Sequence, residues 1–252
     1  MLNLIFSILA GAAAWGISLL IFDSIWSGLL PFFIVFIVAF ILFNRMTQKK
    51  ISAIMNNAQS MMMNVQSLPS ELAKRNLIDK CIAEFKKAYA YNNYAFFLKQ
   101  QINSQIGSLY YVQKRFKDAE PYLKDGFPMQ GPTMCMYGCL LYKDKKEKEM
   151  IEQFEKTVKF NKKEPLYWNV YAWCLNQLKK RDEAIAVLNR CLAQHPSDKI
   201  TRDNLDLLKN SAKVKMTPYE MQWYQFLLED PPQAMIQKML LDKHSVVRSH
   251  HH

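Results

Sequence analysis

Hydrophobic residues are concentrated at the start of the chain, in two long segments joined by a short polar link. Residues 2–22 contain no charged side chain, and residues 28–44 form a second uncharged segment that approaches 20 residues once its flanking apolar residues are counted. An α-helix needs about 20 apolar residues to cross the hydrocarbon core of a bilayer. The pattern therefore predicts a transmembrane helical hairpin over residues 1–44, with spans at about 2–22 and 26–44 and with Trp26 at the membrane interface.

A cleaved signal peptide is the alternative interpretation of the first segment. No Lys or Arg precedes it, and its small residues are followed by more apolar sequence, which argues against cleavage. Arg45, Lys49 and Lys50 follow the second segment, whereas the link offers only Asp23. By the positive-inside rule we expect a multi-pass protein of the inner membrane, with both termini and the rest of the chain in the cytoplasm.

Small residues within the first span have the spacing of close helix contacts in lipid. The positions are Ala10, Ala12, Ala14 and Gly16. Small residues four apart let helix backbones approach each other closely. We expect these four to pack either against the second span or against a partner protein.

Residues 45–69 predict an amphipathic juxtamembrane linker helix. Its apolar positions recur at helical spacing opposite Asn, Gln and Ser: Ile51, Ile54, Met55, Ala58, Met62 and Val65. The simplest interpretation is a cytoplasmic extension of the second span. The alternative is an adaptable apolar surface for homo-oligomerisation, centred on the run of three methionines at 61–63.

Paired amphipathic helices recur through the rest of the chain. In residues 165–198 the large Trp168 and the small Ala172 share one face of the first helix, Ala184 lies on the second, and Pro196 ends the unit. Earlier segments match at steps of about 34 residues, with one step three residues short. The matching positions are Tyr137, Gly138, Met150, Phe154 and Thr157 in one copy, Ile106, Gly107, Tyr110, Phe116, Ala119, Leu123 and Gly126 in the copy before it, and Cys81, Phe85 and Ala88 in a half copy.

These residues and their spacing resemble the tetratricopeptide repeat (TPR) family. The resemblance implies an all-α fold in which the hairpin is followed by a right-handed TPR-like helical solenoid over residues 70–213. We assign a half copy to 75–92, copies to 100–130, 131–164 and 165–198, and a capping helix to 199–213. Members of the family bind peptides or protein surfaces along the concave wall formed by the first helix of each pair. By register, this wall comprises Ser104, Ser108, Tyr111, Cys135, Cys139, Tyr142, Asn169, Trp173 and Asn176.

Residues 214–247 predict C-terminal helices separated at Pro231-Pro232. Thr217 is the expected N-cap of the first helix, and Glu220 would complete a capping box. Large apolar residues around Trp223 indicate that this segment either folds back over the wall or binds a partner. Residues 248–252 are typical of a cloning remnant and affinity tag, and no structural role is expected of them.

Charge and chemistry narrow the functional classes. Asp23 is the only charged residue before Arg45, so the chain from Arg45 onward has a net charge of +12, against +11 for the whole. Its Lys clusters are interleaved with Glu, unlike a one-sided phosphate-binding stripe, so no nucleic acid is expected.

The five cysteines lie within apolar helix patterns, which is expected of buried cysteines in the reduced state. Glycine-rich phosphate loops and HExxH, CxxC and GxSxG motifs are absent from the sequence, so we expect no enzyme, cofactor or metal.

These features predict a membrane-anchored TPR scaffold that recruits or assembles protein partners at the cytoplasmic face of the inner membrane, as a subunit of a membrane complex. One alternative is a subunit of an exopolysaccharide synthesis and export machinery, because a hairpin followed by a cytoplasmic TPR domain resembles the layout of one inner-membrane protein of Pel-type export. An enzymatic or nucleic-acid-binding protein is the remaining alternative.

Overall fold

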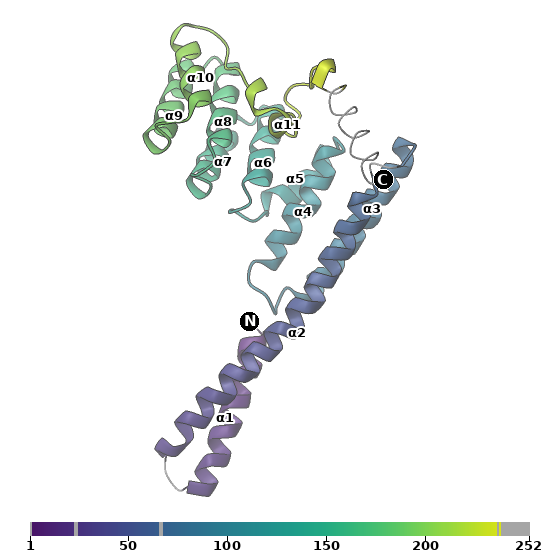
Figure 1. Ribbon diagram of the computed structural model, residues 1–252, viewed down its shortest axis with the longest axis vertical. Helices are drawn as coiled ribbons and strands as arrows, with labels where there is room; N and C mark the ends of the chain where they lie inside the picture. Colours follow the sequence, from purple (N-terminus) through teal and green to yellow (C-terminus); the bar gives the residue numbers. More distant parts are fainter. Residues whose placement is uncertain (1, 23–24, 66–67, 236, 238–252) are drawn as a thin grey trace, which may run out of the picture. The chain divides into compact units, whose positions relative to one another are not determined.

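The computed structural model describes residues 2–22, 25–65, 68–235 and 237, and over these residues all regular secondary structure is helical (Figure 1). The all-α prediction is therefore confirmed for the described residues. The chain divides into two compact units. The first comprises Met1–Gln113 with Asp125–Phe127, and the second comprises Lys114–Lys124 with Pro128–His252.

The first unit begins with an apolar helical hairpin. Helix α1 (Leu2–Phe22) is followed by a short 3₁₀ helix, η1 (Ile25–Gly28), and by α2 (Leu29–Met63), and α1 packs along the first part of α2 (Figure 1). Both helices are long and apolar enough to cross a membrane. The 35 residues of α2 extend about 52 Å, well beyond a hydrocarbon core of about 30 Å. The first part of the linker expected over residues 45–69 therefore continues the second apolar helix, as the simpler interpretation predicted, because α2 runs without a break to Met63.

Polar and small residues form the buried face of α1. Asn3, Ser7, Gly11 and Ser18 lie on this face, and the Asn3 side-chain amide donates to Asn44 Oδ1 and to Thr47 Oγ1, each at 3.1 Å. A Cβ atom added to Gly11 would lie 3.0 Å from the ring and the carbonyl oxygen of Phe32 in α2. The absence of a side chain at Gly11 therefore allows α1 and α2 to approach closely.

Of the four predicted packing residues of α1, two are partly covered within the chain, and the other two are left with the alternative of packing on a partner protein. Ala10 and Ala14 are half-buried, whereas Ala12 and Gly16 are exposed. A Cβ atom added to Gly16 would meet nothing within 4 Å. Each residue turns the helix by about 100°, so Ala12 and Gly16 face away from the stripe that contains Gly11.

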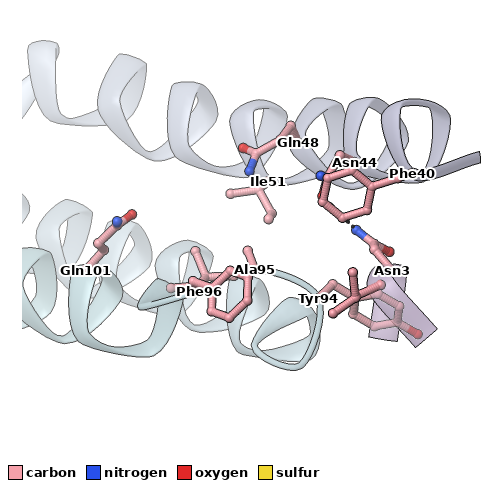
Figure 2. A pocket seen from close by; sticks show the side chains of 11 residues that line it. Asn3, Phe40, Asn44, Gln48, Ile51, Tyr94, Ala95, Phe96 and Gln101 are labelled. Atoms are coloured by element: carbon pink, nitrogen blue, oxygen red, sulfur yellow. Dashed lines mark hydrogen bonds between the residues drawn. The ribbon is translucent and has the colours of Figure 1, made fainter. Parts of the chain in front are cut away.

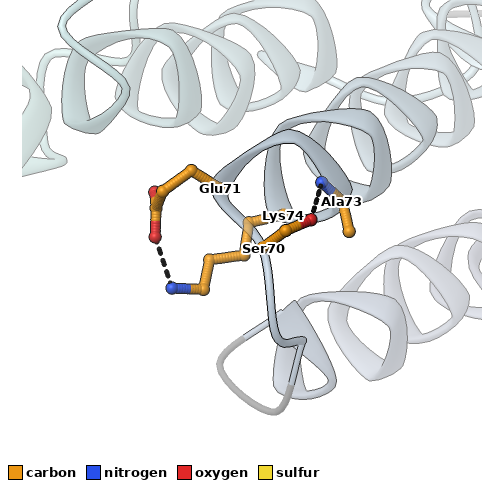
Figure 3. A network of polar contacts seen from close by, with 4 residues as sticks. All are labelled: Ser70, Glu71, Ala73 and Lys74. Carbon is orange, nitrogen blue, oxygen red and sulfur yellow. Dashed lines mark hydrogen bonds and ion pairs between the residues drawn. The ribbon is translucent and has the colours of Figure 1, made fainter.

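Three further helical elements complete the first unit. They are α3 (Glu71–Lys87), η3 (Ala88–Tyr91) and α4 (Leu98–Val112), and α3 packs against both α2 and α4. Ser70 caps the N-terminus of α3, since its hydroxyl accepts the Ala73 amide hydrogen at 3.1 Å. The Lys74–Glu71 ion pair lies on the first turn of this helix (Figure 3).

The second unit consists mainly of helix pairs. After α5 (Phe116–Lys124), helix α6 (Gly131–Lys143) packs on α7 (Glu147–Phe160), α8 (Pro165–Gln177) packs on α9 (Arg181–Gln194), and α10 (Lys199–Lys209) packs on α9. The segments assigned to the copies 131–164 and 165–198 each contain one such pair. At the small position of α6, a Cβ atom on Gly138 would lie 2.8 Å from the buried Phe154 ring of α7, so a larger residue does not fit there.

The turns that end α6, α8 and α10 repeat one backbone conformation. Lys145, Lys179 and Ser211 each have a positive φ, of 60°, 64° and 60°. The following amides, of Lys146, Lys180 and Ala212, each donate to the carbonyl five residues earlier, at 2.9, 2.9 and 2.8 Å. This is the Schellman helix ending, built here without glycine. Lys145 and Lys179 are 34 positions apart in the sequence.

The C-terminal segment differs from its prediction. Instead of a long helix from Thr217, the structure has a 3₁₀ turn, η4 (Thr217–Tyr219), and a short helix, α11 (Met221–Tyr224). After Pro231-Pro232, residues 233–235 are again helical, as the prediction of a second helix expected. The expected capping box is wrong, because Glu220 has a φ of 49° and no side chain caps either of these two described elements. Trp223 and Phe226 are fully buried, and tertiary burial of these rings overrides the local helix signal. The remainder of the predicted C-terminal helices, from residue 238 on, lies outside the described residues.

Candidate partner-binding site

The predicted concave wall of the second unit is built from α6 and α8, which lie side by side. Tyr142 of α6 meets Trp173 of α8 edge to face, with ring centroids 5.8 Å apart. Trp173 in turn meets Trp223 of α11 at 5.2 Å, also edge to face. Tyr142 and Asn176 are half-buried, whereas Trp173 is only 6% exposed. Trp223 covers Trp173, which agrees with the alternative in which the C-terminal segment folds back over the wall.

We call residues 213–230 the C-terminal strap, because they lie across this wall. The indole N–H of Trp223 donates to Glu229 Oε2 at 3.0 Å, and the Lys143 ammonium at the end of α6 donates to the Leu227 carbonyl. Phe226 is fully buried beside them. Apolar burial and the hydrogen bond from Lys143 hold the strap against the wall, whereas the Trp223–Glu229 bond lies within the strap.

A buried amide network joins the strap to α8 and α10. Asn169 Nδ2 lies 2.7 Å from Thr201 Oγ1 and 2.8 Å from the Tyr219 hydroxyl oxygen, and Asn169 Oδ1 accepts from Asn204 Nδ2 at 2.9 Å. Asn204 Oδ1 accepts the Lys215 backbone amide hydrogen at 2.8 Å. Burial raises the pKa of Tyr219, so its phenol remains neutral. Asn169 is one of the predicted wall residues, and its hydrogen-bonding capacity is used within the protein.

Two predicted wall cysteines form a closed cluster with a third cysteine of α8. Cys135 and Cys139 of α6 and Cys174 of α8 have no solvent exposure. Burial raises the pKa of Cys135 and Cys174 well above the ordinary thiol value. Burial also opposes ionisation of Cys139, but hydrogen bonds from the other two thiols and the nearby Lys143 ammonium lower its pKa to about 6. Lack of solvent access keeps these thiols from reagents, and no group of acidic, histidine and cysteine side chains among the described residues could hold a metal ion.

The remaining predicted wall residues belong to α4 in the first unit. The Ser104 hydroxyl accepts the Phe127 amide hydrogen at 2.8 Å, and Ser108 donates to the Gln105 carbonyl at 2.8 Å. Tyr111 is fully buried. Within this unit, Ser104 therefore has a structural role in fixing the backbone at Phe127.

The first unit contains a cavity beside the start of the hairpin. Its volume is about 420 Å³, and it lies between the first turn of α1, the middle of α2 and the segment that leads into α4 (Figure 2). Carboxamides and rings dominate its lining, and none of the described residues that line it is charged: they include Asn3, Asn44, Gln48, Gln101, Tyr94 and Phe96. Sequence reasoning missed this hollow, because its walls come from three distant segments.

Sequence reasoning also missed the residues that complete the wall in the second unit. Tyr219, Thr201 and Asn204 carry the amide network, yet none belongs to a motif. The only available signal was the density of large apolar residues around Trp223, which predicted that the segment is covered by something. Comparison with known proteins adds no further assignment, since no family model matches the chain and no curated protein matches it either.

Proposed function

We propose that the protein is a membrane-anchored adaptor. In this proposal the apolar hairpin holds a TPR-like, right-handed helical solenoid at the cytoplasmic face of the inner membrane, where it assembles protein partners as a subunit of a membrane complex.

The continuity of α2 carries the proposal. One helix begins as a segment whose large apolar side chains are exposed, as in a lipid-facing helix, and continues as a segment that packs on α3. The anchor and the folded part of the first unit therefore share one rigid element. Exposed Arg45, Lys49 and Lys50 mark where the apolar part ends, and they favour the cytoplasmic side for the chain beyond them.

The repeated turns support the TPR-like assignment. Lys145 and Lys179 adopt the same left-handed conformation 34 positions apart, which is the period of the family. Gly138 packs under Phe154 in the manner of a small residue that lets two helices touch. Stacked pairs of this kind present extended surfaces for binding proteins.

The strap sets how a partner would use the wall. Trp173 is a suitable anchor, since interface energy concentrates on Trp and Tyr, but it is covered by Trp223. A partner at this site therefore has to displace residues 213–230. Loosening the strap should strengthen binding, whereas removal of Trp173 should weaken it.

Partner recovery from full-length protein in mild detergent tests this proposal. Trp223→Ala should raise the recovery of the wall partner. Trp173→Ala should lower the recovery, because it weakens the binding free energy by about 2 kcal/mol, or roughly thirtyfold in affinity. Leu188→Ala is the matched control, because Leu188 is a fully buried core residue of α9 and its truncation lowers stability without removing a wall side chain. If no protein is recovered above the level seen with the hairpin alone, the adaptor function is wrong. Equal recovery by Trp173→Ala and the control would place the partner elsewhere.

A further inference from the structure

The segment that connects η3 to α4 exposes two adjacent aromatic side chains. We call residues 92–97 the aromatic loop. Phe96 is 61% exposed and Phe97 is 59% exposed, although both are large and apolar. Phe97 has a φ of 57°, a left-handed conformation that bulky residues rarely adopt. Both rings remain more than half exposed, and Phe97 keeps an unfavourable backbone conformation, which points to a use for this segment.

Hydrogen bonding fixes the aromatic loop beside the start of the hairpin. The Leu2 amide at the first turn of α1 donates to the Asn93 carbonyl at 2.9 Å. Tyr94 and Phe96 form one side of the cavity whose other side is Phe40, Asn44 and Gln48 of α2 (Figure 2). The loop therefore lies at the same level as the Asn3–Asn44 hydrogen bond.

The composition of α2 changes at that level. Leu42 and Phe43 are exposed and apolar, whereas the exposed residues that come after Asn44 include Arg45 and Lys49. Hydrocarbon would surround the first group, and water and lipid headgroups the second. The aromatic loop thus continues the apolar surface of the hairpin at the point where that surface gives way to charge.

We propose that the aromatic loop inserts into the headgroup and upper acyl-chain region of the bilayer, as a third attachment beside the two spans. This inference rests on the proposed membrane anchoring. Aromatic residues are enriched at this depth, and the Tyr91–Tyr94 pair, with ring centroids 6.4 Å apart, adds amphipathic rings next to the two phenylalanines. Arg45, Lys49 and Lys50 suit the anionic headgroups of the cytoplasmic leaflet. Three attachments would fix the depth and rotation of the first unit at the membrane surface.

Depth-dependent quenching in vesicles tests the insertion. Full-length protein carries one polarity-sensitive fluorophore on an introduced cysteine, in vesicles of zwitterionic and anionic phospholipid with a nitroxide near the top of the acyl chain. The five native cysteines are buried, so the introduced thiol takes the label. Phe96→Cys is the test position, because the Phe97 ring contacts Phe127 at 5.7 Å and its loss would also remove that contact.

Two further positions make the result decisive. Leu20→Cys labels a side chain of α1 that is 87% exposed and lies near the far end of the span, and it reports whether the hairpin is in the bilayer at all, through the same nitroxide in the opposite leaflet. Val112→Cys labels an exposed apolar position at the far end of α4, about 21 Å along that helix from the loop.

The proposal expects severalfold stronger quenching and a blue-shifted emission at position 96 compared with position 112. If position 20 is quenched while position 96 behaves like position 112, the loop does not insert and the membrane anchoring stands. If position 20 is not quenched, the anchoring itself is wrong and the loop proposal falls with it.

Discussion

Helix α1 of the first unit and helix α9 of the second have opposite distributions of polar residues. The buried face of α1 contains Asn3, Ser7 and Ser18, while Leu9 and Leu20 are 60% and 87% exposed. Helix α9 buries Ala184, Val187, Leu188 and Cys191, and exposes charged residues such as Arg181, Asp182 and Arg190. Burial of apolar surface stabilises α9, as expected in water. The reverse pattern is expected in hydrocarbon, where close packing and hydrogen bonds between helices replace the hydrophobic driving force.

The largest predicted effect concerns the wall of the second unit. Trp173→Ala should lower the free energy of unfolding by about 3–5 kcal/mol, because it removes a buried ring that contacts both Tyr142 and Trp223. Urea unfolding followed by circular dichroism measures it. Phe160→Ala, at a half-exposed ring of α7, should cost far less. Equal midpoints for the two variants would mean that the strap does not cover the wall in solution.

A charge on the exposed face of α1 tests the inverted pattern. Leu9→Asp should oppose membrane insertion by about 2.5–3.5 kcal/mol, since a carboxylate near the centre of a span has to leave water. The fraction that resists alkaline extraction from membranes measures this effect. Asn189→Asp on the exposed face of α9 should change stability by less than about 0.5 kcal/mol. If Leu9→Asp remains as firmly inserted as the parent, α1 is not surrounded by lipid.

The two glycines of α1, Gly11 and Gly16, test which face of this helix packs against α2. Gly11→Ile should force α1 away from Phe32, with a cost of about 1–3 kcal/mol in hairpin stability. Gly16→Ile should leave the hairpin unchanged, because the space beside Gly16 is open. Thermal unfolding in detergent compares them. A loss at Gly16 alone would show that α1 packs on α2 through its other face.

The smallest expected effect concerns the repeated turns. Lys179→Gly should stabilise the second unit by about 0.5–1 kcal/mol. Glycine relieves the left-handed strain at this position, and this gain exceeds the cost of its greater conformational freedom in the unfolded chain. Lys156→Gly, in the interior of α7, should instead destabilise by about 1 kcal/mol. Both shifts are measured by chemical denaturation. Destabilisation by Lys179→Gly would contradict the turn geometry.

Local patterns predicted most of the helices, since helical periodicity and Pro or charged turns are encoded in neighbouring residues. The two apolar helices and the pairs α6–α7 and α8–α9 are of this kind. The C-terminal strap was mispredicted as a helix, because the capping signal at Thr217 is local whereas burial of Trp223 depends on α6 and α8.

Orientation of side chains was predicted less well than secondary structure. The residue spacing places Trp173 on the predicted wall, but it cannot reveal that Trp223 covers the indole. In α1, small residues occur on more than one face, so Ala12 and Gly16 were as plausible as Gly11. Polar Asn3 and Ser7 were a usable signal, because a polar group in a span needs a partner.

The proposed anchoring requires the apolar hairpin to span a membrane and to leave the rest of the chain on the side of Arg45. Labelling of single introduced cysteines in intact spheroplasts with a membrane-impermeant maleimide tests this topology. Trp26→Cys and Met63→Cys are suitable positions, because these side chains are 80% and 79% exposed while the native cysteines are buried. We expect labelling at position 26 from outside and labelling at position 63 only after lysis. Labelling of position 63 in intact spheroplasts would contradict the proposed anchoring.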